Sequence, residues 1–186
     1  MANRNEQGFG LIAAGALGQT PATSGQGKYK IDAGYGTTLF HGGAVASAAG
    51  YIVDGQTTDA PILGVLNGIF YNAATTLKPT FANHYVQVTP ANSEDIDAFV
   101  FDNPTQQYVV ATDDAVAQAG YLETYDMNTT AGSTTTGQSS ATLDIADTSA
   151  DADSWRLLRS AEDPENDENA AFRSVVVVAN LIELQS

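Results

Sequence analysis

Two glycine-containing stretches are the first candidates for chemistry, because glycine-rich loops can hold the phosphates of a nucleotide. Residues 8–13 read Gly-Phe-Gly-Leu-Ile-Ala and match the dinucleotide pattern G-x-G-x-x-A by letter. That pattern works only with a strand before the loop and a helix after it, and the polar leader MANRNEQ does not predict a strand. Residues 132–139 imitate a phosphate-binding loop, but Gln138 stands where the lysine is required. We therefore expect no cofactor.

Histidines and carboxylates are the remaining candidates for catalysis or metal binding. His41 lies beside a predicted turn, His84 opens a predicted strand, and no G-x-S-x-G nucleophile motif accompanies them. We expect no catalytic residue and interpret the chain as a non-enzyme. The acidic residues of 144–153 and 162–168 could offer oxygen atoms to calcium, but neither run has the D-x-[DN]-x-[DN]-G spacing. We interpret them as solvated acidic turns and expect no metal site.

Length and charge limit the possible partners. A chain of 186 residues can bury about 70% of its unfolded surface, enough to fold without disulfides or metals. Seven Lys and Arg against 22 Asp and Glu give a formal net charge of −15, which should repel DNA and anionic membranes. The N-terminus lacks the long apolar stretch of a signal peptide or membrane span. We therefore expect synthesis in the cytoplasm, with no nucleic-acid or membrane partner.

Residues 1–27 predict an N-terminal arm. They contain six glycines and only four large apolar side chains, Phe9, Leu11, Ile12 and Leu17. Ordering about twenty residues costs ~20–40 kcal/mol, whereas burying four such side chains returns only ~6–12 kcal/mol. The arm should therefore be extended and packed on another subunit, with these four residues as its contacts.

From Lys28 onward, short β-rich runs alternate with turn-forming residues. Strands are expected near residues 28–31, 44–49, 62–71, 85–88, 99–101 and 108–110. Asn67-Gly68 predicts a hairpin or a bulge within the apolar run 62–71. One short helical turn is expected from Asp113 to Gly120, with Asp113 or Asp114 as the cap at its start and Gly120 at its end.

The C-terminus contains the most apolar run, Val175 to Val178. Four β-branched residues in a row favour a strand that is buried on both faces. We expect this strand to be flanked by others on each side, with Val177 facing one core layer and Val176 and Val178 facing the other. The fold prediction is an all-β barrel or sandwich, jelly-roll-like, with at most one or two short helices. Residues 28–186 would form a single β domain.

Several stretches, taken in order, carry a resemblance to a known family. They are residues 8–11, Tyr29 with Ile31, and residues 39–45, 62–65, 98–104, 132–143, 157–158 and 163–166 ahead of the valine-rich end. In this order they resemble a family of structural proteins encoded near the major capsid gene of tailed bacteriophages. The motifs are strand-and-turn patterns that extend over most of the chain.

The resemblance implies a capsid decoration, or cement, protein. Such a protein would stabilise an HK97-type shell by bridging neighbouring capsid subunits on the outer capsid surface of the virion. Its partners would be the major capsid protein and itself, as a homotrimer. Two alternatives stay open: a head–tail connector or tail component, and a carbohydrate-binding β domain that uses Tyr35, Tyr51 or Tyr71.

Overall fold

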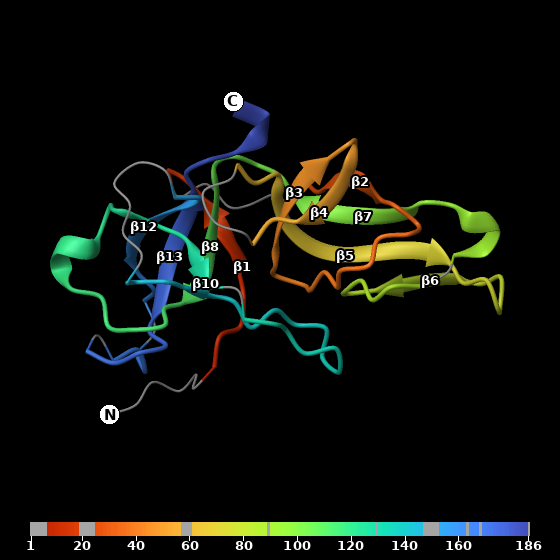
Figure 1. The fold of residues 1–186 in the computed structure, drawn as a ribbon. Coiled ribbons are helices and arrows are strands. Elements are labelled where there is room, and N and C mark those ends of the chain that lie inside the picture. The colour runs from red at the N-terminus through yellow and green to blue at the C-terminus, as the bar shows by residue number, and fades with distance from the viewer. Residues whose placement is uncertain are drawn as a thin grey trace.

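The computed structural model describes residues 7–18, 25–56, 61–88, 90–128, 130–146, 153–162, 164–167 and 169–185. Two main sheets lie side by side, with β1, β8, β12 and β13 in one half of the molecule and β2 to β7 in the other (Figure 1). The predicted all-β class is confirmed.

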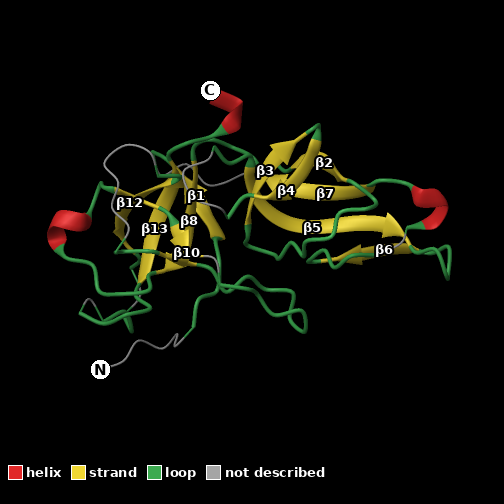
Figure 2. Cartoon of the chain, viewed as in Figure 1, coloured by secondary structure: helices red, strands yellow, loops and turns green. Residues whose placement is uncertain are grey.

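Helical structure in the described ranges is limited to three turns of 3-10 helix (Figure 2). These are η1 (Ala91–Ser93), η2 (Gln118–Gly120) and η3 (Glu183–Gln185). Of the turn expected from Asp113 to Gly120, only η2 is helical, and its N-cap is Ala117 and not an aspartate. η1 and η2 lie at opposite ends of the molecule (Figure 2).

The first sheet is antiparallel and has the strand order β1-β8-β13-β12-β9. Its strands are β1 (Ile12–Ala16), β8 (Gln106–Ala111), β9 (Thr124–Tyr125), β12 (Trp155–Ser160) and β13 (Ser174–Ala179). A small ladder of β10 (Met127–Asn128) and β11 (Thr142–Leu143) accompanies it. The predicted position of the C-terminal strand is confirmed, since β13 is the middle strand of five. Val177 faces the core between Tyr108 and Leu157, whereas Val176 and Val178 are buried on the opposite face.

The second sheet has the strand order β2-β7-β5-β3-β4, with β6 added to the far part of β5. Its strands are β2 (Gly27–Ile31), β3 (Ala44–Ala48), β4 (Tyr51–Asp54), β5 (Gly64–Asn72), β6 (Pro79–Ala82) and β7 (Ile96–Phe101). β2 and β4 approach each other but do not pair within the described residues. The sheet is thus curled yet open, and the barrel alternative does not apply.

The second sheet shows the outcome of two predictions about short segments. Asn67-Gly68 makes a bulge inside the continuous strand β5, where the register against β7 shifts between Leu66 and Gly68. The prediction of a strand at residues 85–88 is wrong, because Tyr85 makes only an isolated bridge to Leu39. Tyr85 is nevertheless fully buried and donates its hydroxyl proton to the carbonyl of Tyr35.

Each sheet has its own hydrophobic core, and the first core extends across the junction between the sheets. Trp155 and Tyr108 form its centre, with ring centroids 5.6 Å apart and edge to face. Ala44, Ile62 and Val65, which come from the second half, pack into the same core. An isolated bridge between Ile62 and Ile182 adds a backbone link. The two halves are therefore joined by packing as well as by the chain.

The prediction of a loose arm over residues 1–27 requires a correction. Residues 12–16 form β1, which pairs with β8, and Leu11 is buried in the first core of its own chain. The segment before β1 is also bonded at its backbone, because Leu11 N donates to Gly42 O at 2.8 Å. The entropy estimate counted only apolar side chains and omitted this backbone pairing. The β domain thus begins inside the segment assigned to the arm, while residues 1–6 and 19–24 lie outside the described ranges.

Candidate functional site: two exposed apolar surfaces

The two glycine-containing stretches pack against each other. The side-chain amide of Gln138 donates to the carbonyl of Phe9 at 2.8 Å, and Gly10 N donates to Ala141 O at 3.2 Å. Gly10 has φ +71°, and a side chain there would meet Gly42 O at 2.7 Å. The glycine pattern near the N-terminus therefore reflects close approach of backbone to backbone.

The histidines and the tyrosines considered earlier make internal contacts. His41 Nδ1 lies 3.0 Å from the carbonyl of Asn67, and the His84 ring stacks on Phe40. Tyr35 accepts a hydrogen bond from Asp54 N, and Tyr51 donates to Asp95 at 3.1 Å. Tyr71, half-buried, packs on the second core.

The acidic runs are only partly described. Within the described ranges, no three His, Asp or Glu side chains approach closely enough to share a metal ion. Asp147, Asp151, Asp163 and Glu168 lie outside those ranges. In the same ranges, no helix has the length and apolar character that a membrane crossing requires.

The four residues predicted as arm contacts separate into buried and exposed ones. Leu11 is only 2% exposed and Phe9 is half-buried, so neither is a free anchor for another subunit. Ile12 and Leu17 are 45% and 44% exposed. These two residues, which we call the β1 rim, lie on and just after an edge strand of the first sheet. The β1 rim is the part of the predicted interface that the structure leaves accessible.

A second exposed surface lies on the outer face of the second sheet, and the strand register defines it. Opposed residues of antiparallel strands share a face, and Lys30, Asp97, Phe70 and Phe81 are opposed in turn across β2, β7, β5 and β6. Lys28 opposes Phe99 in the next row of the same face. We call this set the lysine–phenylalanine face; its members are Lys28, Lys30, Phe70, Phe81, Asp97 and Phe99.

A glycine explains how the phenylalanines of this face come together. The rings of Phe81 and Phe99 have centroids 6.0 Å apart, although β5 runs between their strands. Gly68 lies between them, and a side chain there would meet the Phe81 ring at 3.1 Å. Phe81 remains 64% exposed, and Leu77, on the connection before β6, is also exposed. The result is an aromatic shelf open to solvent.

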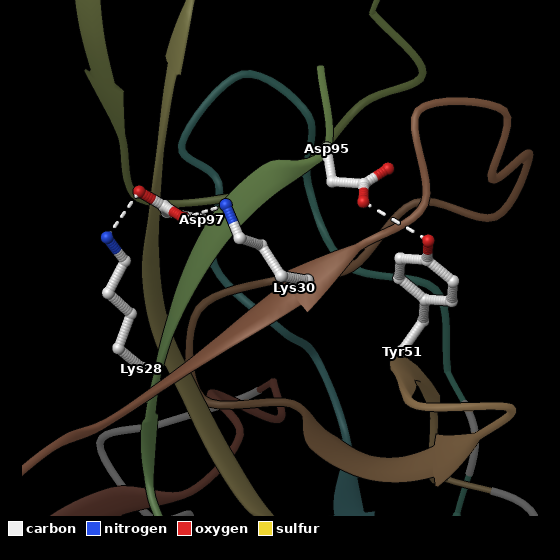
Figure 3. Close-up of polar contacts among 5 residues, drawn as sticks. All are labelled: Lys28, Lys30, Tyr51, Asp95 and Asp97. Carbon is white, nitrogen blue, oxygen red and sulfur yellow. Dashed lines mark hydrogen bonds and ion pairs between the residues drawn. The ribbon is translucent and has the colours of Figure 1, made fainter. Parts of the chain in front are cut away.

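Charged residues of the same face contact one another (Figure 3). Asp97 lies between two lysines, with Oδ2 2.7 Å from Lys28 Nζ and Oδ1 2.6 Å from Lys30 Nζ. Burial acts to raise the pKa of Asp97, but the hydrogen bonds and charges of the two lysines outweigh it and hold the pKa below its ordinary value. The two lysine side chains are 60% and 50% exposed, so the pairs add little to stability. They orient the two lysines along the shelf.

The pKa of Asp97 offers a test of this arrangement. With a lowered pKa, Asp97 stabilises the fold above its ordinary pKa of 3.8, and this contribution is lost as the pH falls through the lowered value. Replacing Lys28 and Lys30 together by glutamine should raise the pKa of Asp97, because the burial remains and the cations are gone. Carboxyl NMR titration measures the shift. An unchanged pKa would mean that the lysines do not contact Asp97 in solution.

One further hollow lies at the opposite end of the molecule, with a volume of about 590 Å³. It lies between η2 and the connection from β12 to β13, and Tyr121, Leu158 and Arg173 are among its lining residues. The Arg173 guanidinium lies 5.6 Å from the centroid of the Tyr121 ring.

Comparisons with known proteins found no family model, no curated protein and no solved structure that matches this chain. Function must therefore be argued from the two surfaces. Sequence reasoning identified Ile12 and Leu17 but missed the lysine–phenylalanine face. Alternation of Lys28 and Lys30 with inward residues was visible, yet Phe70, Phe81 and Phe99 lie on three different strands. Only the pairing of those strands brings them together.

Proposed function

We propose that this chain is a structural protein of a tailed-phage particle that decorates the outside of an HK97-type capsid and bridges neighbouring capsid subunits. The observation that carries the proposal is the presence of two sets of exposed apolar side chains in one body. The strands that carry them, β1 and β5 to β7, lie in different halves of the molecule (Figure 1). A protein that bridges needs at least two docking surfaces, whereas a protein that only binds one ligand needs one.

Grouping of the exposed apolar side chains supports this proposal. Single exposed apolar residues are ordinary, but clusters with a polar border mark interaction sites. On the second sheet, exposed Phe81 packs against Phe99, Phe99 lies opposite Lys28, and Leu77 is exposed on the connection before β6. On the first sheet, Ile12 and Leu17 lie along an edge strand, where backbone groups are available for pairing with another chain.

A protein that decorates a capsid does not need any single contact to be strong. A body that contacts several subunits of a lattice gains avidity from each additional contact. The proposed partners are the major capsid protein and further copies of this chain in a homotrimer. Net charge −15 is compatible with a role on the outside of the shell, away from the packaged DNA.

Binding to phage heads tests the proposal. Purified protein added to heads of the encoding phage that lack it should bind in hundreds of copies per head. The double variant Ile12→Asp/Leu17→Asp should bind at least tenfold more weakly, because two carboxylates would be buried at the contact. Leu184→Asp, which alters an exposed leucine on η3 outside both surfaces, is the matched control.

Occupancy is read by sedimentation with the heads and by particle reconstruction. If the reconstruction shows six or twelve copies at one vertex, the protein is a connector and not a decoration protein. Absence of binding by the folded parent protein would overturn the proposal.

A further inference from the structure

The hollow beside η2, at one end of the molecule (Figure 2), has the size and the mixed lining of a small-molecule site. Its volume of about 590 Å³ lies within the range of roughly 300–1,000 Å³ that is typical of ligand pockets. Val116, Leu122 and Leu158 give it apolar walls, and Tyr121 adds an aromatic ring. Such walls hold the body of a ligand, while a few polar groups fix its orientation.

The charge of the described lining is positive. Its charged members are Arg159 and Arg173, although the chain as a whole carries 22 Asp and Glu against seven Lys and Arg. Glu123 and Glu162, which lie close to lining segments in the sequence, are not part of the lining. A hollow with charges of one sign and low-dielectric walls concentrates their field. Guanidinium groups also match the two oxygens of a carboxylate. The lining therefore favours an anionic ligand.

A β-bulge brings one of the two arginines to the hollow. The register of β12 against β13 shifts between Leu157 and Arg159, so Leu158 is an extra residue in the ladder. Consecutive side chains of a regular strand point to opposite faces, whereas a bulge redirects them. Leu158 and Arg159 accordingly both line the hollow. Arg159 is exposed, and its Nη2 makes a long hydrogen bond of 3.5 Å to Gln107 Oε1, which a ligand can replace.

The second arginine, Arg173, is a fixed positive charge in the wall. It is 3% exposed, its Nη1 donates to Val116 O at 3.4 Å, and its guanidinium lies 5.6 Å from the centroid of the Tyr121 ring. Its carbonyl accepts from Thr112 N at 2.9 Å, and the N–H of the preceding Phe172 donates to Thr112 O at 2.9 Å. A charge that is already held in place loses little freedom when a ligand binds.

Two bulky residues at the hollow have left-handed backbone. Leu122 has φ +69°, and Phe172, next to Arg173, has φ +57°. This conformation is rare for bulky side chains and persists only where the surrounding structure enforces it. At Leu122 the N–H donates to Leu157 O at 2.8 Å, and the carbonyl accepts from Arg156 Nη1 at 2.6 Å. Strained backbone of this kind gathers at ligand-binding sites.

We propose that this hollow binds a small organic carboxylate with an apolar body. The carboxylate would pair with Arg159 and lie near the fixed charge of Arg173. The apolar body would pack against Leu122 and Leu158. The inference goes beyond the proposed function and does not depend on it, because the hollow contains no residue of the β1 rim or of the lysine–phenylalanine face.

Titration of the full-length protein with hydrocinnamate, followed by amide NMR, tests the site. We expect saturable binding with a Kd of about 1 mM or tighter, with shifts at the amides of Tyr121 and Arg159. Two further probes separate charge from shape. Hydrocinnamamide keeps the shape without the charge, and inorganic phosphate keeps the charge without the apolar body. Each should bind about tenfold more weakly. Equally tight binding of the amide would overturn the anionic assignment, and equally tight binding of phosphate would overturn the organic one.

Variants test the residues that would contact the ligand. Arg159→Gln should weaken hydrocinnamate binding about tenfold, because it removes a charge-assisted hydrogen bond. Leu122→Gly should weaken binding about threefold, because it removes an apolar wall, and glycine adopts the left-handed backbone without strain. Lys78→Gln is the control: it makes the same change in net charge at an exposed position before β6 and should leave binding unchanged.

Thermal melting verifies that each variant is folded. Absence of saturable hydrocinnamate binding by the folded parent protein would overturn the inference. So would folded Arg159→Gln and Leu122→Gly variants that bind hydrocinnamate as tightly as the parent.

Discussion

Val177→Asp should leave almost no soluble folded protein. Val177 is fully buried in the middle strand of the first sheet, with Tyr108 and Leu157 directly opposite on the neighbouring strands. An aspartate there would place a carboxylate in an apolar layer without a partner, at a cost of several kcal/mol. Since the total stability of a domain is about 5–15 kcal/mol, this single change removes much of it. Expression in the soluble fraction and the melting temperature measure the effect.

The matched control is the same substitution at an exposed valine. Val86 lies on the surface after the isolated bridge at Tyr85, so Val86→Asp should change the free energy of unfolding by no more than about 0.5 kcal/mol. Soluble Val177→Asp protein that melts within a few degrees of the parent would show that β13 is not the centre of the fold.

Leu11→Ala should lower the free energy of unfolding by about 2–5 kcal/mol, the usual cost of a buried leucine truncated to alanine. Leu11 is 2% exposed and packs in the first core, and its backbone N–H bonds to Gly42. Leu17→Ala is the control, because Leu17 is 44% exposed at the end of β1. That change should cost less than about 1 kcal/mol. Urea unfolding of both variants gives the comparison.

This pair of variants decides between the two accounts of the N-terminal segment. If the segment were an arm packed only on another subunit, Leu11→Ala and Leu17→Ala would have equally small effects on the isolated protein. A loss confined to Leu11→Ala confirms that β1 belongs to the domain. Removal of residues 2–17 would then unfold the first sheet instead of leaving an intact body.

The proposed function depends on a fixed distance between the β1 rim and the lysine–phenylalanine face. A bridging protein needs rigid spacing between its contacts, and packing of Ala44, Ile62 and Val65 into the first core supplies it. Destabilising the core should therefore weaken decoration together with folding. Variants of the β1 rim and of Phe81 should instead affect binding with the fold retained.

Patterns formed by residues close together in the sequence were sufficient to predict part of the fold. Val175 to Val178 predicted a central strand with side chains buried on both faces, because a run of β-branched residues has few other stable conformations. The β-rich run at residues 28–31 likewise predicted strand β2. The lack of a strand before Gly8 and of a lysine at position 138 argued against nucleotide binding, since that chemistry depends on residues close in sequence.

Contacts between distant segments decided the rest, and no local pattern encodes them. The N-terminal segment is ordered because the Leu11 N–H bonds to the Gly42 carbonyl and the Gln138 side chain bonds to the Phe9 carbonyl. The partners are far apart in the sequence, so closing the loops between them costs entropy that only the folding of the whole chain offsets. The lysine–phenylalanine face exists because β2, β7, β5 and β6 pair in a register that puts its residues in adjacent rows. Sequence thus determined which residues prefer strands and which face of a strand is apolar. Tertiary structure alone determined which strands are neighbours, and with that which apolar side chains gather on the exposed faces of the protein.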